Sequence, residues 1–185
     1  LTAVITFANS SSSESSASNV PFVPTYKEGS FGEFLQDYAR EAIPDVKVEI
    51  DINNPTASEN ISYGTVDGRN NVLITEEEGY VEFTVEVPAT GLYSIGVDYY
   101  PIKGKSSAIE RNIYINGQLP YTEARAATLD RIYKDNVEDL HDYDSFFTKD
   151  TYGNETRKQQ IENPRWVEGA SFRDASASYD MSLKF

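Results

Sequence analysis

The sequence contains no cysteine among its 185 residues. This excludes disulfide bonds, thiol catalysis and cysteine metal sites, and it leaves the redox compartment undetermined. Histidine occurs once, at His141, which excludes a histidine-rich metal site and disfavours a Ser-His-Asp triad. Positive charge is also scarce, since 16 lysines and arginines stand against 30 aspartates and glutamates, a net charge of −14. Nucleic acids and anionic membranes attract clustered positive charge, so we expect neither nucleic acid nor membrane insertion.

Tyrosine is abundant instead, with 13 tyrosines against a single tryptophan. A tyrosine offers a flat apolar face and a hydroxyl, which suits polar ligands, although strands also favour it. A chain of 185 residues is long enough for one domain with a real core and too short for two. No two of the 30 acids stand apart as the acid and nucleophile of a glycoside hydrolase, so we do not expect an enzyme.

The amino end, "LTAVITFANSSSSESSASN", joins a short apolar run to a serine-rich tract. The run is too short to span a bilayer, and it resembles the end of a secretory signal followed by a flexible linker. We therefore predict that residues 1–25 lie outside the folded domain, and that the protein is extracellular or at the cell surface. The alternative is an apolar end of no special role. Because the chain does not begin with Met, we expect it to be part of a longer protein.

Residues 30–42 predict one amphipathic helix ahead of the strands. Ser30 and Glu33 form the spacing of a capping box, and Pro44 ends the helix. Its apolar residues recur at helical spacing on one face. We interpret this helix as a packing element, because the opposite face carries acids rather than lysines.

After Pro44 the apolar residues alternate with polar ones, the pattern of half-buried strands. The alternation covers residues 46–53, 80–87, 93–99 and 111–115. Asn116-Gly117, which follows the last of these, is a strong hairpin signal. Short alternating strands separated by turns predict a mostly β domain, an antiparallel β-sandwich, over residues 26–185.

The segment "GYVEFTVEVPATGLYSIGVDYYPIKGKSSAIERNIYINGQ", residues 79–118, resembles the core of galactose-binding-like β-sandwich (jelly-roll) carbohydrate-binding modules. It holds a Gly-Tyr-Val-Glu strand, a Pro-x-x-Gly-x-Tyr turn and a strand ending in Tyr-x-Asn-Gly, in that order. The stretches "YYPIKGKSSAIER", "RIYKDN" and "ENPRWVEGASFRD" are similar to a module near the amino end of Gram-positive extracellular solute-binding proteins of sugar ABC transporters. The resemblance implies a glycan-binding module of a larger protein. The alternative is a structural or interaction domain without a glycan ligand.

Sugar recognition needs aromatic platforms and planar groups that hydrogen-bond to hydroxyls. The residues that we select for these roles, near the loop after residue 99 and in the "PRW" stretch, are Tyr99, Tyr100, Lys103, Glu110, Arg111, Arg165 and Trp166. An acidic sugar would make the cations the main contacts. Alternatively, the tyrosines belong to the core, Arg111 pairs with a surface acid and Trp166 is buried packing.

Glu49 and Asp51 lie on one face of the predicted strand in "VEIDIN". The resemblance implies a structural calcium near this strand, and carboxylate oxygens suit Ca²⁺. A solvated acidic face is the alternative.

The carboxyl end, "YDMSLKF", alternates like a strand. The closing strand of the resembled module would lie beyond it, which leaves an open sheet edge. We therefore expect the protein to continue, or the fragment to cover the edge by self-association or with its amino-terminal segment.

Overall fold

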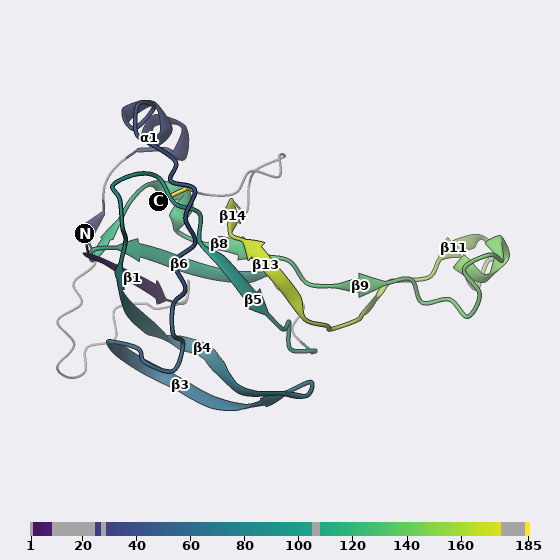
Figure 1. Ribbon diagram of the computed structural model, residues 1–185. Coiled ribbons are helices and arrows are strands. Elements are labelled where there is room, and N and C mark those ends of the chain that lie inside the picture. Colours follow the sequence, from purple (N-terminus) through teal and green to yellow (C-terminus); the bar gives the residue numbers. More distant parts are fainter. Residues whose placement is uncertain (1, 9–24, 27–28, 105–107, 175–183) are drawn as a thin grey trace.

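Antiparallel strands dominate the structure, a computed structural model that describes residues 2–8, 25–26, 29–104, 108–174 and 184–185. Eight of the described strands form one large curled sheet (Figure 1). The prediction of a mostly β domain is therefore confirmed. Across the sheet the order is β14 (Arg173–Asp174), β8 (Ala127–Leu129), β6 (Ile109–Ile115), β1 (Thr2–Ala8), β4 (Arg69–Glu86) and β3 (Ala57–Val66). Off this path, β2 (Thr25–Tyr26) runs parallel to β7 (Gln118–Leu119).

Strand β1 lies inside the sheet, hydrogen-bonded to β4 on one side and to β6 on the other. This differs from the prediction that residues 1–25 lie outside the folded domain. The reason is that the apolar residues of this strand alternate: Phe7 stands opposite both Val81 and Ile113. On the other face, Thr6 is fully buried, and its hydroxyl donates to the Glu82 carboxylate. Residues 9–24 of the predicted linker lie outside the described residues.

The core has two parts that meet at β1. One is centred on Ile113, Tyr121 and Phe172, and the other on Val81, Phe83 and Val85. Phe7 touches both, since its ring stacks on Phe172 at 5.8 Å and meets Phe83 edge-on at 6.5 Å. The inward alternation predicted for residues 80–87 is confirmed.

Residues 46–53 were predicted to be a strand, and this is wrong, because the structure assigns no strand to this segment. Part of the predicted inward face nevertheless packs against the core. Val48 and Ile50 pack against the cluster of Val81 and its neighbours, whereas Val46 and Ile52 are exposed. Alternation therefore reports which side chains are buried and does not establish a hydrogen-bonded partner strand.

The only α-helix among the described residues, α1 (Phe31–Asp37), is capped as predicted. Ser30 Oγ accepts from the Glu33 N–H at 3.2 Å, and the Glu33 carboxylate accepts from the Ser30 N–H at 2.7 Å. The hydrogen bond from the Ser30 backbone lowers the pKa of Glu33. The helix ends five residues earlier than predicted, because only its first turns meet the core; Tyr38 is already exposed. Within the described chain, no helix has the length and apolar content needed to cross a membrane.

A second, two-stranded ladder pairs β5 (Gly96–Tyr99) with β13 (Val167–Ser171). Val97, Tyr99 and Ala170 pack from this ladder against the first core cluster. The prediction of a strand over residues 93–99 is thus correct for its second half. Tyr93 instead exchanges two backbone hydrogen bonds of 2.9 Å with Phe185. The rest of the predicted last strand falls mainly outside the described residues.

Between β8 and β13 the chain runs out from the body as a long arm (Figure 1). The arm contains two short ladders, and none of its residues from 133 to 162 belongs to either core cluster. Its elements are β9 (Tyr133–Lys134), η2 (Tyr143–Phe146), β10 (Phe147–Lys149), β11 (Glu155–Arg157) and β12 (Ile161–Glu162). The remaining short helix, η1 (Thr122–Ala124), lies in the body against β6 and α1.

Candidate functional site

A cavity of about 280 Å³ lies between the β5–β13 ladder and the end of β8. Its apolar lining comes from Leu129, Ile132, Val167 and Ala170. Tyr99, the last residue of β5, adds an aromatic ring to the wall. The volume is close to the lower limit of about 300 Å³ for typical small-molecule pockets, so it suits one sugar ring better than an extended chain.

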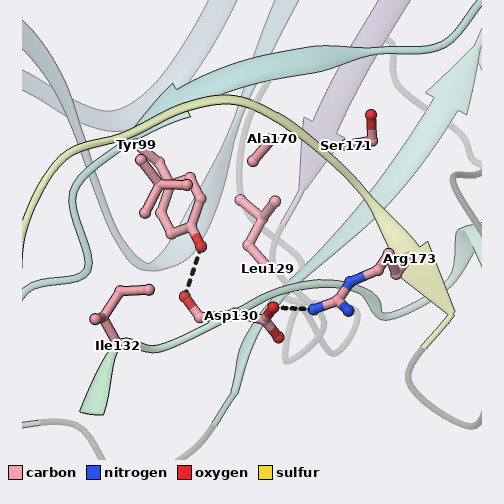
Figure 2. A pocket seen from close by; sticks show the side chains of 8 residues that line it. Tyr99, Leu129, Asp130, Ile132, Ala170, Ser171 and Arg173 are labelled. Atoms are coloured by element: carbon pink, nitrogen blue, oxygen red, sulfur yellow. Dashed lines mark hydrogen bonds and ion pairs between the residues drawn. The ribbon is translucent and has the colours of Figure 1, made fainter. Parts of the chain in front are cut away.

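Polar groups gather beside Tyr99 (Figure 2). The Tyr99 hydroxyl donates to the backbone oxygen of Asp130 at 2.7 Å. The Asp130 carboxylate forms an ion pair with Arg173, so that Asp130 lies between the tyrosine and the arginine. The Asp130 side chain is 63% exposed and that of Arg173 is 29% exposed. An accessible carboxylate is therefore held in place by a less accessible guanidinium.

The strands themselves position these groups. Arg173 is in β14, directly opposite Thr128 of β8, and its backbone oxygen accepts from the Thr128 hydroxyl at 3.2 Å. Asp130 follows β8 by one residue. Burial raises the pKa of Tyr99, and the nearby Asp130 charge raises it further. The phenol is therefore a neutral donor and an apolar ring at physiological pH.

A β-bulge shapes the ladder next to the cavity. Val167 pairs with Tyr99, whereas Ala170 pairs with Val97, so β13 carries one more residue than β5 over this stretch. Gly169 lies in the bulge with a φ of 63°, and its N–H donates to the Asp98 carboxylate at 2.8 Å. A left-handed φ is readily adopted by glycine, which explains the residue at this position.

Tyr100 faces a different group of side chains from Tyr99. Its ring lies 5.7 Å from that of Trp166, and the Arg69 guanidinium lies 4.2 Å above the same indole. Arg69 also pairs with the Glu168 carboxylate at 2.5 Å. The indole N–H of Trp166 is buried without a hydrogen-bond partner. The structure therefore brings the predicted residues Tyr100 and Trp166 together, but with a cation already covering one face of the indole.

Arg111 and Glu110 lie elsewhere, in β6. The Arg111 guanidinium donates to the Thr75 hydroxyl and to the Glu110 backbone oxygen, both at 2.7 Å. Burial lowers the pKa of Arg111. It borders a hollow of only about 20 Å³, which has room for roughly one water molecule. The hollow beside Arg111 is therefore too small for a sugar.

The remaining predicted contacts, Lys103 and Arg165, are both exposed. Next to Lys103, the Gly104 N–H donates to the Glu162 carboxylate at 2.7 Å, and the same carboxylate accepts from Arg131 at 3.4 Å. The loop after β5 is thus tied to the base of the arm over its described residues. The cations of "YYPIKGKSSAIER" that the structure describes do not converge on one site.

Two residues of the cavity, Asp130 and Arg173, were not predicted. Asp130 directly follows three buried residues in "ATLD", and Arg173 directly follows the buried Phe172 in "SFRD". A charged residue in such a position indicates a side chain that a strand holds at the edge of the sheet. No local pattern, however, indicates that these two distant residues meet.

Glu49 and Asp51, the predicted calcium ligands, are both exposed. Glu49 pairs with Lys47 at 3.1 Å, and Asp51 accepts from the Asn53 N–H at 3.0 Å. Over the described residues, no three acidic or histidine side chains cluster in a way that could hold a metal ion. The calcium site stays a prediction.

The arm exposes large apolar side chains far from the cavity-lining strands. Tyr152 is 89% exposed, Tyr143 72% and Leu140 69%. The turn before β11 is ordered by Asp150, whose carboxylate accepts from the Tyr152 and Asn154 N–H groups. The Asn154 side-chain amide donates to the same carboxylate at 3.1 Å, and this bond is the largest cause of the lowered pKa of Asp150, followed by the backbone hydrogen bond of Asn154.

We expect the arm to be removable. Lys134 and Ile161 are directly paired, so residues 135–160 could be replaced by an Asn-Gly turn. The melting temperature should fall by less than about 4 °C, because no core contact is lost and a larger shift would mean a loss of more than about 1 kcal/mol. Calorimetric unfolding of both proteins measures this. A large drop would mean that the arm contributes to the stability of the body.

Comparisons with known protein families, with curated proteins and with solved structures returned no match for this chain. The chemistry of the cavity and of the arm is therefore what bears on function.

Proposed function

We propose that this chain is an extracytoplasmic carbohydrate-binding module, built as a β-sandwich of the jelly-roll type and belonging to a sugar-transporter solute-binding protein. The observation that carries the proposal is the cavity in which an aromatic ring, a carboxylate and a guanidinium lie together over an apolar wall. The family resemblance of residues 79–118 supports the same function.

The chemistry of the cavity matches what a sugar ring requires. The Tyr99 ring offers a flat surface for the C–H face of a pyranose, and its hydroxyl is already committed to Asp130. The exposed Asp130 carboxylate offers oxygens that accept hydrogen bonds from sugar hydroxyls. Bonds to a charged acceptor are stronger than neutral ones, which suits a weakly held polyol.

Trp166 provides a direct test, since it is the only tryptophan and is adjacent in sequence to Val167 of the cavity wall. We expect its fluorescence to change on titration with a binding sugar, and calorimetry should give the same affinity. Asp130→Ala should weaken binding at least about tenfold, because a charged hydrogen bond contributes roughly 1.5–3 kcal/mol. Tyr152→Ala, an exposed tyrosine in the arm, is the matched control and should bind like the parent.

A panel of neutral, acidic and amino monosaccharides and their oligomers covers the ligand class. If no sugar binds to the folded chain, the proposal fails. If a sugar binds but Asp130→Ala leaves its affinity unchanged, the site is not this cavity.

The arm favours a second candidate function, an interaction domain of a larger cell-surface protein. Exposed Leu140, Tyr143 and Tyr152 stand on an element that adds nothing to the core of the body. Large apolar side chains presented in this way are typical of protein contacts. If the folded chain binds none of the sugars, that result would support this candidate over the first.

A further inference from the structure

We infer that the cavity selects neutral or amino sugars and rejects uronic acids, and that Asp130 is the residue that sets this selectivity. The inference rests on the proposed function, because it specifies the ligand of the same cavity. It departs from the expectation that cations would make the main contacts to an acidic sugar.

A ligand at the cavity meets a negative charge. Asp130 is the more exposed member of the ion pair, at 63% against 29% for Arg173. A ligand at the cavity therefore meets a carboxylate that is more open to contact than the guanidinium. Hydroxyl and ammonium groups donate hydrogen bonds to a carboxylate, whereas the carboxylate of a uronic acid only repels it.

The Arg173 guanidinium gives an acidic sugar little advantage. A uronate carboxylate that reaches Arg173 would either replace Asp130 as its ion-pair partner or lie beside Asp130 on the same guanidinium. Replacement exchanges one carboxylate for another, and either arrangement leaves Asp130 beside the incoming anion. No net gain follows that would offset the repulsion, because like charges at short range disfavour each other.

The rest of the chain also disfavours anionic ligands. Its net charge of −14 adds a negative field around the site, which lowers the local concentration of anions. The apolar wall of Leu129 and Ala170, together with the Tyr99 ring, suits the C–H face of a neutral pyranose. The net charge, the apolar wall and the Tyr99 ring thus all disfavour an acidic sugar or suit a neutral one.

The role of Arg173 follows from this geometry. Its backbone is fixed in the β8–β14 ladder, and its side chain pairs with Asp130. It is a positioning residue, which holds the carboxylate over the cavity. We therefore expect Arg173→Gln to weaken binding of neutral sugars less than Asp130→Ala does.

The experiment compares methyl glycosides of galactose and glucose, the corresponding uronates, and glucosamine, by calorimetry and Trp166 fluorescence. We expect the uronates to bind at least about tenfold more weakly than the neutral glycosides of the same configuration. Asp130→Asn should then reduce or reverse this preference, because it removes the negative charge of Asp130 from beside Arg173. The gained uronate affinity should fall with rising salt, as an exposed charge contact does.

The outcomes are distinct. Uronates that bind the parent protein as tightly as neutral sugars would overturn the inference and leave the proposed function standing. A preference for neutral sugars that Asp130→Asn does not alter would also overturn it, since Asp130 would then not set the selectivity. Absence of binding to every sugar would overturn both.

Discussion

Gly79→Ala should destabilise the protein by about 3–5 kcal/mol, one of the largest effects of any single substitution in the sheet. Gly79 has a φ of +131°, which side chains rarely tolerate. A Cβ atom at this position would lie 2.4 Å from the Glu59 backbone oxygen and 2.9 Å from the Cβ of Asn60. The first of these contacts is with backbone, so the strand itself would have to move.

Urea denaturation of the variant measures the loss. Gly96→Ala is the matched control, because Gly96 also lies in a strand but has no atom within 4 Å of the added Cβ and no left-handed φ. We expect the control to stay within about 1 kcal/mol of the parent. Equal stabilities of both variants would show that the β3–β4 pairing adapts around Gly79.

The reason that Gly79 is critical lies in the irregular pairing of β3 with β4. The register jumps from Glu59 opposite Tyr80 to Ile61 opposite Thr75. Four residues of β4, 76–79, therefore lie opposite the single residue Asn60 of β3. Asn60 takes a left-handed φ of 53° there. Thr75, on the far side of the jump, accepts the hydrogen bond that holds Arg111. The Thr75 hydroxyl thus ties the half-buried Arg111 of β6 to β4 beside this bend.

Local signals in the sequence predicted the parts of the fold that depend on neighbouring residues. Asn116-Gly117 forms the predicted tight turn, with φ values of 51° and 73° and Ile115 paired to Gln118. Asp67-Gly68 forms an equivalent turn between β3 and β4, with Val66 paired to Arg69. The same rule for two-residue hairpins would have predicted it.

Features that depend on distant partners could not be predicted in this way. The apolar residues 2–8 have a composition that fits the end of a secretory signal and a strand equally well. Their strand identity depends on β4 and β6, which follow far later in the chain. Residues 46–53 show the opposite case. Their apolar and polar residues alternate, but the segment pairs with no strand.

The candidate site illustrates the same limit. Tyr99 and Tyr100 are neighbours in sequence, but alternation along a strand separates them: Tyr99 lines the cavity and Tyr100 meets Trp166. Arg111 was selected for its charge, yet its partner Thr75 makes it part of the sheet. The ion pair at the cavity joins β14 to the residue after β8, a contact that no local pattern encodes.

Tyr121 should be the most sensitive side chain of the core. It is fully buried, and its ring lies 4.9 Å from Phe31, 5.0 Å from Phe34 and 5.7 Å from Phe185. It thereby joins α1 and the carboxyl end to the sheet. Tyr121→Ala should cost about 3–5 kcal/mol, as expected for removing a buried aromatic ring. The exposed Tyr152→Ala is the control, and a similar loss for both would contradict this role.

The hydroxyl of Tyr121 makes the stability of the protein depend on pH. This dependence distinguishes the contribution of the hydroxyl from that of the packed ring. It donates to the Lys184 backbone oxygen at 2.7 Å, and burial, followed by the charge of Glu123, raises the pKa of Tyr121 far above its ordinary value near 10. The stability gained from the neutral phenol is therefore complete below about pH 10. Above that, the unfolded chain ionises first, and each pH unit removes about 1.4 kcal/mol until the folded pKa is reached.

Tyr121→Phe keeps the ring and removes the ionisable group, so it should cost only about 1 kcal/mol at pH 7. Between pH 10 and pH 11 it should lose stability less steeply than the parent, by about 1 kcal/mol. Some dependence should remain in the variant, because burial also raises the pKa of Tyr80 and of Tyr99. Urea unfolding at pH 7, 10 and 11 measures the difference. Parallel losses in the two proteins over this range would mean that the Tyr121 phenol ionises as easily in the folded state as in the unfolded one.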